Sequence, residues 1–283
     1  MMISILTGSD LARRILSLPE HERRQATVHL QRLVEQKRAA RPPRLPDAPS
    51  LARAAGLEPD PWQERFLASK APRILLNCTR QAGKSTMASV LAVQTAMAQR
   101  KALVLLLSPS LRQSGELFKK SMHVFRSIGD VPRPASESAL RLELVNGSRI
   151  VSLPGKEDTV RGFSGVDLII IDEAARVPGD LYLSVRPMLA VSGGRLAALS
   201  TPFGTRGWFY DAWVSSEPWE RFEIPATECP RISQEFLDEE RRTMGDWWFE
   251  QEYMCKFLDS SSQAFGREDV DRAFAEEVDT WEL

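Results

Sequence analysis

One stretch constrains the fold most, because it joins an apolar strand pattern, a short loop and a helical pattern. Residues 73–78 form a largely apolar run, and the following loop ends in Gly83-Lys84-Ser85, where a helical pattern starts. The N–H groups of residues 80–85 would point at a phosphate, Lys84 would reach the β- and γ-phosphates, and the Ser85 hydroxyl would bind Mg²⁺. The strict pattern has Gly where Cys78 stands, so an ordinary strand-to-helix turn containing Gly-Lys-Ser is the structural alternative.

A second apolar stretch ends in two carboxylates. Residues 168–171 are followed by Asp172 and Glu173. The carboxyl ends of buried parallel strands mark the ligand-binding edge of an α/β sheet. Asp172 would hold Mg²⁺ through water or a hydroxyl, and Glu173 would orient and polarise an attacking water, as phosphoryl transfer requires. Such a pair is also a common helix N-cap, but its combination with Gly83-Lys84-Ser85 favours a nucleotide site.

Short apolar runs alternate with helical patterns from about residue 60 onward. This alternation predicts an α/β fold with a mostly parallel sheet and helices on both of its faces. Asn146-Gly147 lies between two strand patterns and predicts a hairpin turn. The expected strands are 73–78, 102–107, 140–145, 149–153, 168–172 and 196–200. The expected helices are 84–99, 111–127, 180–190 and 205–215.

The predicted organisation has three parts. Residues 1–50 combine amphipathic helices with a linker, residues 41–50, that holds four prolines. Residues 51–230 form the α/β core, and residues 231–283 form a small helical lid or linker unit. The net charge of −1 gives no support to a DNA-coating protein, although residues 1–50 hold nine basic and five acidic side chains. Three scattered cysteines indicate neither a zinc site nor a disulfide framework, and no apolar run is long enough for a membrane span.

Four segments together resemble the N-terminal ATPase domain of tailed-phage large terminases. The first is the loop Thr79-Arg80-Gln81-Ala82-Gly83-Lys84-Ser85, with an Arg-Gln pair and without the first glycine. The others are Pro61-Trp62-Gln63, the sequence Leu199-Ser200-Thr201-Pro202, and residues 249–257. The resemblance covers roughly residues 55–275. It implies a P-loop NTPase fold of the ASCE or RecA-like type, with an N-terminal helical arm and a small C-terminal helical lid.

The resemblance implies an ATPase that couples Mg²⁺-dependent ATP hydrolysis to movement of double-stranded DNA into a procapsid. Gln63 would recognise adenine, Arg80 would sense the γ-phosphate, and Arg161 would reach a neighbouring subunit's site as an arginine finger. Ser200 and Thr201 would couple hydrolysis to movement. The expected catalytic residues are Glu173, Lys84, Arg80 and Arg161, and the expected metal ligands are Ser85 and Asp172. The expected nucleotide-binding residues are Gln63, Thr79, Arg80, Gln81, Ala82, Gly83, Lys84, Ser85 and Thr86.

The expected partners follow from the same resemblance. They are double-stranded DNA, the portal protein, the small terminase subunit and further copies of the chain in a ring, a pentamer by family analogy, on the portal. The isolated chain would be a monomer in the host cytoplasm and would associate only transiently with the procapsid portal. We expect no nuclease activity, because the family's second, nuclease domain has no counterpart and Glu276, Glu277 and Asp279 lie on a tail.

Alternative interpretations remain open at this stage. Gln63 is also compatible with a polar face beside a core tryptophan, and Ser200-Thr201 with a hydroxyl-initiated turn. Arg80 is also compatible with a solvated loop charge, and Arg161 with a loop-anchoring ion pair. A helicase-like DNA-dependent ATPase is one functional alternative, although it needs a second RecA-like domain. The other is a non-motor module that recruits the small terminase subunit and DNA through its basic N-terminal helices, although Glu173 argues against a merely structural nucleotide site.

Overall fold

The computed structural model describes residues 19–24, 26, 46–129, 131, 134–154, 160 and 162–259. The chain divides into two compact units, 1–45 and 46–283. In the first unit the structure describes a helical turn at residues 20–24. The remainder of the expected helical arm, the linker up to residue 45, Arg161 and the tail beyond residue 259 lie outside the described residues.

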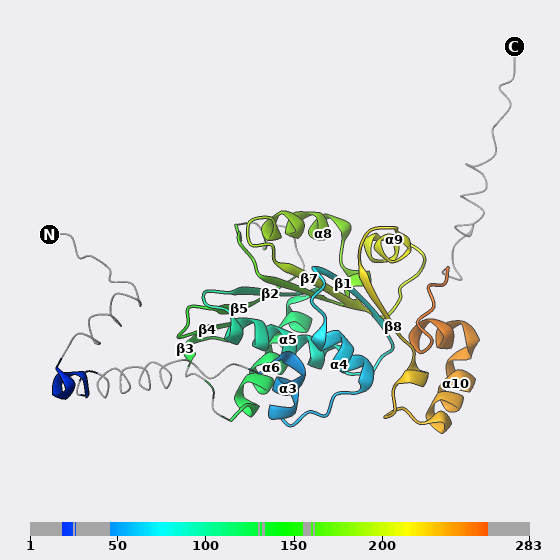
Figure 1. Cartoon of the computed structure of the whole chain (residues 1–283). Coiled ribbons are helices and arrows are strands. Elements are labelled where there is room, and N and C mark those ends of the chain that lie inside the picture. The colour runs from blue at the N-terminus through cyan, green and yellow to red at the C-terminus, as the bar shows by residue number, and fades with distance from the viewer. Residues whose placement is uncertain are drawn as a thin grey trace, which may run out of the picture. The chain divides into compact units, whose positions relative to one another are not determined.

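The second unit is built on an eight-stranded sheet with strand order β3-β4-β5-β2-β6-β7-β1-β8 (Figure 1). The six strands from β5 to β8 in that order run parallel, and β3 and β4 add an antiparallel hairpin edge. Strand β7 separates β1 from β6. The strands are β1 (Arg73–Cys78), β2 (Leu103–Ser108), β3 (Pro134–Glu137), β4 (Arg141–Leu144), β5 (Arg149–Pro154), β6 (Leu168–Asp172), β7 (Arg195–Ser200) and β8 (Glu220–Ile224). The expectation of a mostly parallel α/β sheet is confirmed.

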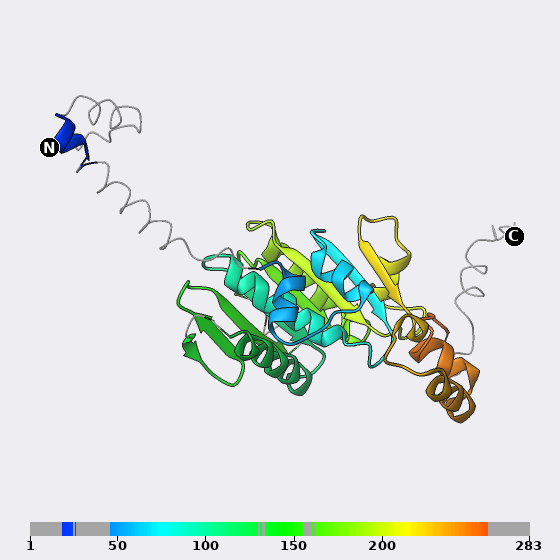
Figure 2. The ribbon, with the colours of Figure 1, turned by 60° about the horizontal axis from the view of Figure 1, so that its bottom comes forward.

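Helices cover both faces of this sheet (Figures 1 and 2). One face carries α3 (Ala48–Ala54), α4 (Pro61–Ala68), α5 (Lys84–Ala98) and α6 (Leu111–Ser127). The other face carries α8 (Gly179–Val185) and α9 (Trp208–Val214). Helix α10 (Gln234–Glu252) follows β8 and has its own small core around Leu237 and Phe249. The described residues of this unit also form the 3₁₀ helices η1 (Ala174–Arg176), η2 (Arg186–Leu189) and η3 (Ala226–Glu228).

The central strands are buried on both faces, which explains their continuous apolar sequences. Every residue of β2 and β6 is buried. Leu105, Leu107 and Ile171 belong to a core cluster that also contains Leu181 of α8. Because side chains alternate along a strand, the residues between them face α5 and α6. The same alternation decides whether a polar side chain at the end of β2 or β6 faces α8 or faces α5 and α6.

The helix boundaries differ from expectation where glycine or proline intervenes. The expected helix 180–190 is wrong in its second half: α8 ends at Val185 and the chain continues as the 3₁₀ helix η2, in which Pro187 offers no N–H for a helical bond. The expected helix 205–215 starts only at Trp208, because Gly207 precedes it with φ 86° and ψ 164°.

The segment 48–50, expected in the extended linker, is instead the first turn of α3. Asp47 accepts a hydrogen bond from the Ser50 N–H at 2.9 Å and so caps the helix, and Pro49 lies in the first turn, where its missing N–H is tolerated. Strands β3 and β8 were not expected from the sequence. All four residues of β3 are exposed, so this edge strand has no apolar pattern.

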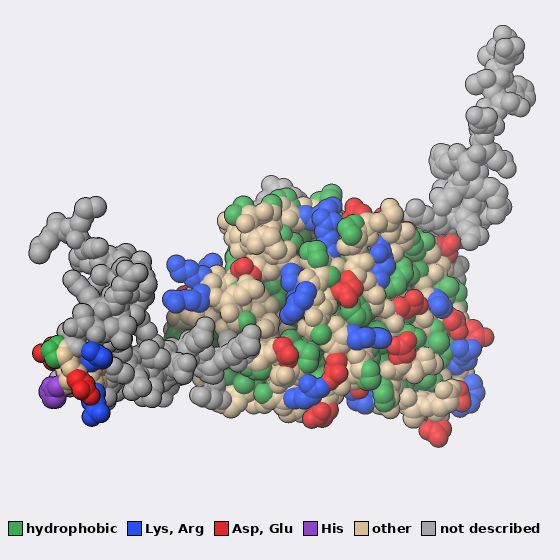
Figure 3. All heavy atoms as spheres, viewed as in Figure 1, with side chains coloured by type: hydrophobic (Ala, Val, Ile, Leu, Met, Phe, Trp, Pro, Cys, Tyr) green, Lys and Arg blue, Asp and Glu red, His purple; other side chains and the backbone are tan. Residues whose placement is uncertain are grey.

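The face of the molecule drawn in Figure 3 shows no dominant sign of charge. Basic and acidic side chains are interspersed over the face drawn in Figure 3, in agreement with the net charge of −1. Among the described residues, no helix is both long and apolar enough to cross a membrane.

We predict that the thiols of Cys78 and Cys255 are unreactive in the native protein. Both side chains are buried, and burial raises the pKa of Cys78 to about 12 and also raises that of Cys255. Because the thiolate is the reactive species, alkylation at pH 8 should be at least ~100-fold slower at both cysteines than in denaturant. Mass spectrometry of iodoacetamide-treated protein measures the two rates. Equal rates with and without denaturant would contradict the burial.

Candidate functional site

The loop between β1 and α5 has the backbone of an anion-binding site. Gln81 and Gly83 both adopt positive φ angles, 63° and 89°, which turn the chain sharply into α5. Gly83 is required here, because a Cβ would also lie 3.0 Å from the Gln63 amide nitrogen. Within the described part of the chain, no side chain caps the N-terminus of α5, whose first residues are Lys84 and Ser85. Helix N-termini of this kind bind phosphate through their N–H groups.

Four of the expected site residues meet at the carboxyl ends of β1 and β6: Lys84, Ser85, Asp172 and Glu173. Lys84 Nζ lies 3.2 Å from Glu173 Oε1, and the Ser85 hydroxyl donates to Asp172 Oδ2 at 2.8 Å. Asp172 Oδ1 accepts from the Glu173 N–H at 3.1 Å. Glu173 itself has a left-handed backbone, with φ 54° and ψ 43°, which is uncommon for a residue with a Cβ. The structure therefore brings together the four residues that the two sequence patterns single out.

Burial and charge act together on this cluster. Burial lowers the pKa of Lys84, but the carboxylates of Glu173 and Asp172 outweigh burial and hold that pKa above its ordinary value. Burial also raises the pKa of Asp172, and the nearby Lys84 ammonium only partly offsets this effect. A divalent cation beside Asp172 would favour its ionised form. A hydroxyl and a carboxylate in contact suit Mg²⁺, which binds hard oxygen ligands and retains several waters.

The phosphate loop is held from one side by Gln63 and Arg231. The Ala82 carbonyl accepts from Gln63 Nε2 at 2.9 Å and from Arg231 Nη2 at 3.1 Å. Gln63 Oε1 in turn accepts from the Asp60 N–H at 3.0 Å, and Arg231 pairs with the Asp60 carboxylate at 2.8 Å. Gln63 is thus a loop-holding and helix-capping residue here, and its contact with adenine stays a prediction. Sequence reasoning missed Arg231, which lies 149 positions from Ala82.

From the other side the loop contacts the end of α10. Arg80 forms an ion pair with Glu252, and the Thr79 hydroxyl donates to the Glu252 carbonyl at 3.1 Å. Asn77, at the end of β1, donates to the Cys255 carbonyl at 2.8 Å. Arg80 is therefore neither a free loop charge nor in contact with the cluster around Lys84. Glu252 belongs to the segment 249–257 that the sequence singles out, but its contact with Arg80 was not anticipated.

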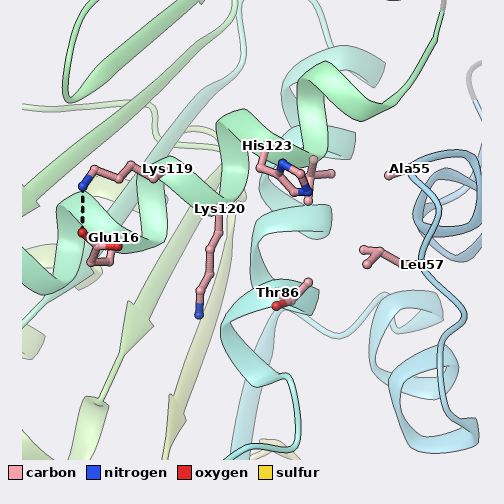
Figure 4. Close-up of a pocket in the computed structure, with 8 residues that line it drawn as sticks. Ala55, Leu57, Thr86, Glu116, Lys119, Lys120 and His123 are labelled. Atoms are coloured by element: carbon pink, nitrogen blue, oxygen red, sulfur yellow. Dashed lines mark hydrogen bonds and ion pairs between the residues drawn. The ribbon is translucent and has the colours of Figure 1, made fainter.

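The remaining expected residues lie at three other places. Ser200, at the end of β7, accepts a hydrogen bond from the Ala175 N–H at 3.2 Å and so connects β7 to the turn that follows Glu173. The next residue, Thr201, is also buried. Thr86 lines a cavity of about 240 Å³ between α5, α6 and the end of α3 (Figure 4). Arg161 lies outside the described residues, so its expected role stays a prediction.

The cavity beside Thr86 combines an apolar wall with a basic rim. Leu57 and Thr86 lie on one side of it, and Lys120 and His123 of α6 project from the other side (Figure 4). Base pockets of nucleotide sites commonly join apolar surface to a few polar groups. The other lining residues are Ala55, Glu116, Lys119 and Val124.

Comparison with known proteins gives one family. The family model described as "Terminase large subunit, T4likevirus-type, N-terminal" matches residues 75–272. The large terminase subunit of Thermus virus P23-45 is 26% identical over 254 residues, covering 76% of this chain and 52% of that protein. That of Escherichia phage T5 is 26% identical over 229 residues, covering 78% and 50%. The chain thus spans about half the length of these relatives.

Solved structures agree with the sequence matches. The ATPase domain of the Thermus phage P74-26 large terminase superposes with a TM-score of 0.67 at 25% identity, covering 76% of this chain and all of that domain. The large terminase of another thermophilic bacteriophage, solved in complex with ADP, has a TM-score of 0.59 at 14% identity, covering 70% and 54%. This second match supports the fold alone.

We predict that Arg231→Gln weakens nucleotide binding about fivefold, because it removes one hydrogen bond that holds the phosphate loop, worth about 1 kcal/mol. Titration with a fluorescent ADP analogue measures the affinity. Arg241→Gln is the matched control, since Arg241 pairs with Asp246 and Glu250 on α10 and has no described contact with the loop. Equal affinities of the two variants would contradict a loop-holding role for Arg231.

Proposed function

The chain belongs to the terminase large subunit family and matches the N-terminal region of its T4likevirus type. We propose that it is the ATP-hydrolysing motor domain of a viral DNA-packaging terminase. One observation carries this proposal: Lys84 and Ser85 of the phosphate loop contact Glu173 and Asp172 at the end of β6. A phosphate-binding helix N-terminus, a cation and two carboxylates at one sheet edge are the components that phosphoryl transfer needs. The P74-26 relative is itself named an ATPase domain.

We propose that ATP binds with its phosphates on the loop Thr79–Thr86 and that Ser85 and Asp172 hold Mg²⁺. The N–H groups at the start of α5 and the Lys84 ammonium would bind phosphate oxygens. The metal ion would neutralise charge on the phosphates. The base would enter the cavity beside Thr86, where Leu57 offers an apolar wall. Gln63 would act mainly by fixing the loop that receives the phosphates.

Glu173 is proposed to orient and polarise the attacking water. Its carboxylate pairs with Lys84, so a γ-phosphate bound at Lys84 would compete for the ammonium and leave Glu173 free for water. Arg80 would undergo a comparable exchange, because its present partner Glu252 is a single carboxylate and a phosphate offers several acceptor oxygens. Arg161 of a neighbouring subunit would stabilise charge in the transition state.

Coupling to movement is proposed to run through β7 and α10. The Ser200 hydroxyl contacts the turn after Glu173, so a change at Glu173 would be transmitted to the end of β7 and to Thr201. The end of α10 contacts the phosphate loop through Glu252, so exchange at Arg80 would remove one of the two contacts of Glu252 with the loop and leave the hydrogen bond from Thr79. The moved substrate would be double-stranded DNA, and the motor would be a ring on the portal that is loaded by the small terminase subunit.

We predict that Glu173→Ala reduces ATP hydrolysis by at least ~100-fold and leaves nucleotide affinity within about threefold, because Glu173 acts on water rather than on phosphate. Lys84→Ala should lose binding as well as hydrolysis. Phosphate release, measured with portal, procapsid and DNA present, gives the rate, and fluorescent-ATP titration gives the affinity.

Glu239→Gln, a change on the exposed face of α10, is the control and should hydrolyse ATP at the wild-type rate. A Glu173→Ala variant as active as this control would remove Glu173 from the proposed mechanism. A wild-type chain that hydrolyses no ATP in the assembled system would remove the motor function itself.

A further inference from the structure

A buried hydroxyl one strand away from Asp172 has no hydrogen-bond partner among the described residues. Ser108, the last residue of β2, is completely buried, and its Oγ makes no hydrogen bond with any described residue. Leaving a buried hydroxyl unsatisfied is unfavourable, and such groups are usually satisfied by water or by a ligand. The mechanism described above makes no use of Ser108.

The sheet register places Ser108 next to Asp172. Strands β2 and β6 are parallel neighbours, and Leu107 lies opposite Ile171, so the next pair along the two strands is Ser108 and Asp172. Leu107 and Ile171 both pack in the core cluster on the α8 face. Because side chains alternate along a strand, Ser108 and Asp172 both face α5. The Ser85 hydroxyl of α5 contacts Asp172 on that face.

The neighbourhood of Ser108 suits a hydrated cation. Asp172 is buried and carries a carboxylate whose two oxygens contact Ser85 and the Glu173 N–H. Mg²⁺ retains several waters when one carboxylate and substrate phosphates hold it, and those waters need acceptors and donors in the protein. A hydroxyl one strand away, on the same face, offers both donor and acceptor capacity.

We propose that Ser108 is a positioning residue for the metal site: its hydroxyl binds a water that also contacts the Asp172 carboxylate and thereby fixes that carboxylate toward the hydrated ion. The proposal rests on the proposed function. Ser108 touches neither nucleotide nor metal directly, so its loss changes the metal dependence of binding and not the phosphate loop itself.

Ser152 of β5 provides a matched control. Its hydroxyl is likewise buried and makes no hydrogen bond with the described residues. It lies opposite Leu106 of β2, and β2 separates its strand from β6. The change Ser152→Ala therefore removes the same atom from a comparable environment further from Asp172.

The test compares Ser108→Ala and Ser152→Ala with the wild type by fluorescent-ATP titration at graded Mg²⁺ concentrations and in EDTA. Ser108→Ala is expected to raise the half-saturating Mg²⁺ concentration about fivefold, the effect of one lost hydrogen bond, with the affinity in EDTA unchanged. Ser152→Ala is expected to match the wild type in both measurements. Ser108→Cys, which retains side-chain volume but hydrogen-bonds weakly, should share the defect of Ser108→Ala and serves if that variant does not fold.

Two results would overturn the proposal. In the first, Ser108→Ala and Ser152→Ala keep the wild-type dependence of ATP affinity on Mg²⁺, or both shift it by the same amount. Ser108 then has no specific role at the metal site, and both hydroxyls serve only to pack the sheet against α6. If the wild type binds ATP equally well in Mg²⁺ and EDTA, or does not bind it, the proposed function fails and the role of Ser108 fails with it. The first result overturns only the role of Ser108 and leaves the proposed nucleotide site standing.

Discussion

Lys84 is the point on which the site depends, because it is a buried cation between two carboxylates. It lies 3.2 Å from Glu173, and Asp172 also raises its pKa. The described cluster therefore carries one positive and up to two negative charges before any phosphate arrives. A triphosphate adds further negative charge, which one ammonium cannot balance in a partly buried site. This charge imbalance is the physical reason to expect a divalent cation where the Ser85 hydroxyl of the phosphate loop meets the Asp172 carboxylate.

The strand order produces this cluster from distant segments. Parallel strands present their carboxyl ends at one edge, and β7 alone separates β1 from β6. The phosphate loop is then fixed by elements on both of its sides: Gln63 and Arg231 hold the Ala82 carbonyl, and Glu252 holds Thr79 and Arg80. Its conformation is thus set by tertiary contacts as well as by Gly83. Under the proposed function, exchange of the Arg80–Glu252 ion pair would connect nucleotide binding to α10.

Sequence patterns predicted the buried elements well and the contacts between distant residues poorly. The bounds of β1, β6 and α6 were predicted without error, because continuous apolar runs and an amphipathic helix leave few alternatives. Strand β3 carries no buried residue and was missed. The two patterns around Lys84 and Asp172 identified four residues that do meet. Arg231 and Glu252 could not be found, because a partner about 150 or more positions away leaves no local signal. The contacts of the Gln63 amide with Asp60 and Ala82 also leave no local signal, and its contact with adenine stays a prediction.

The end of α10 and the residues that follow it contact β1 and the phosphate loop through hydrogen bonds. Two of these hydrogen bonds are accepted by main-chain oxygens, those of Glu252 and Cys255. A carbonyl accepts a hydrogen bond whatever side chain its residue carries. The attachment can therefore persist while the amino acids at these positions drift, provided that Thr79 and Asn77 keep their donors. A chain with other side chains at these two positions could keep both hydrogen bonds, because backbone geometry alone sets where the two carbonyl oxygens lie.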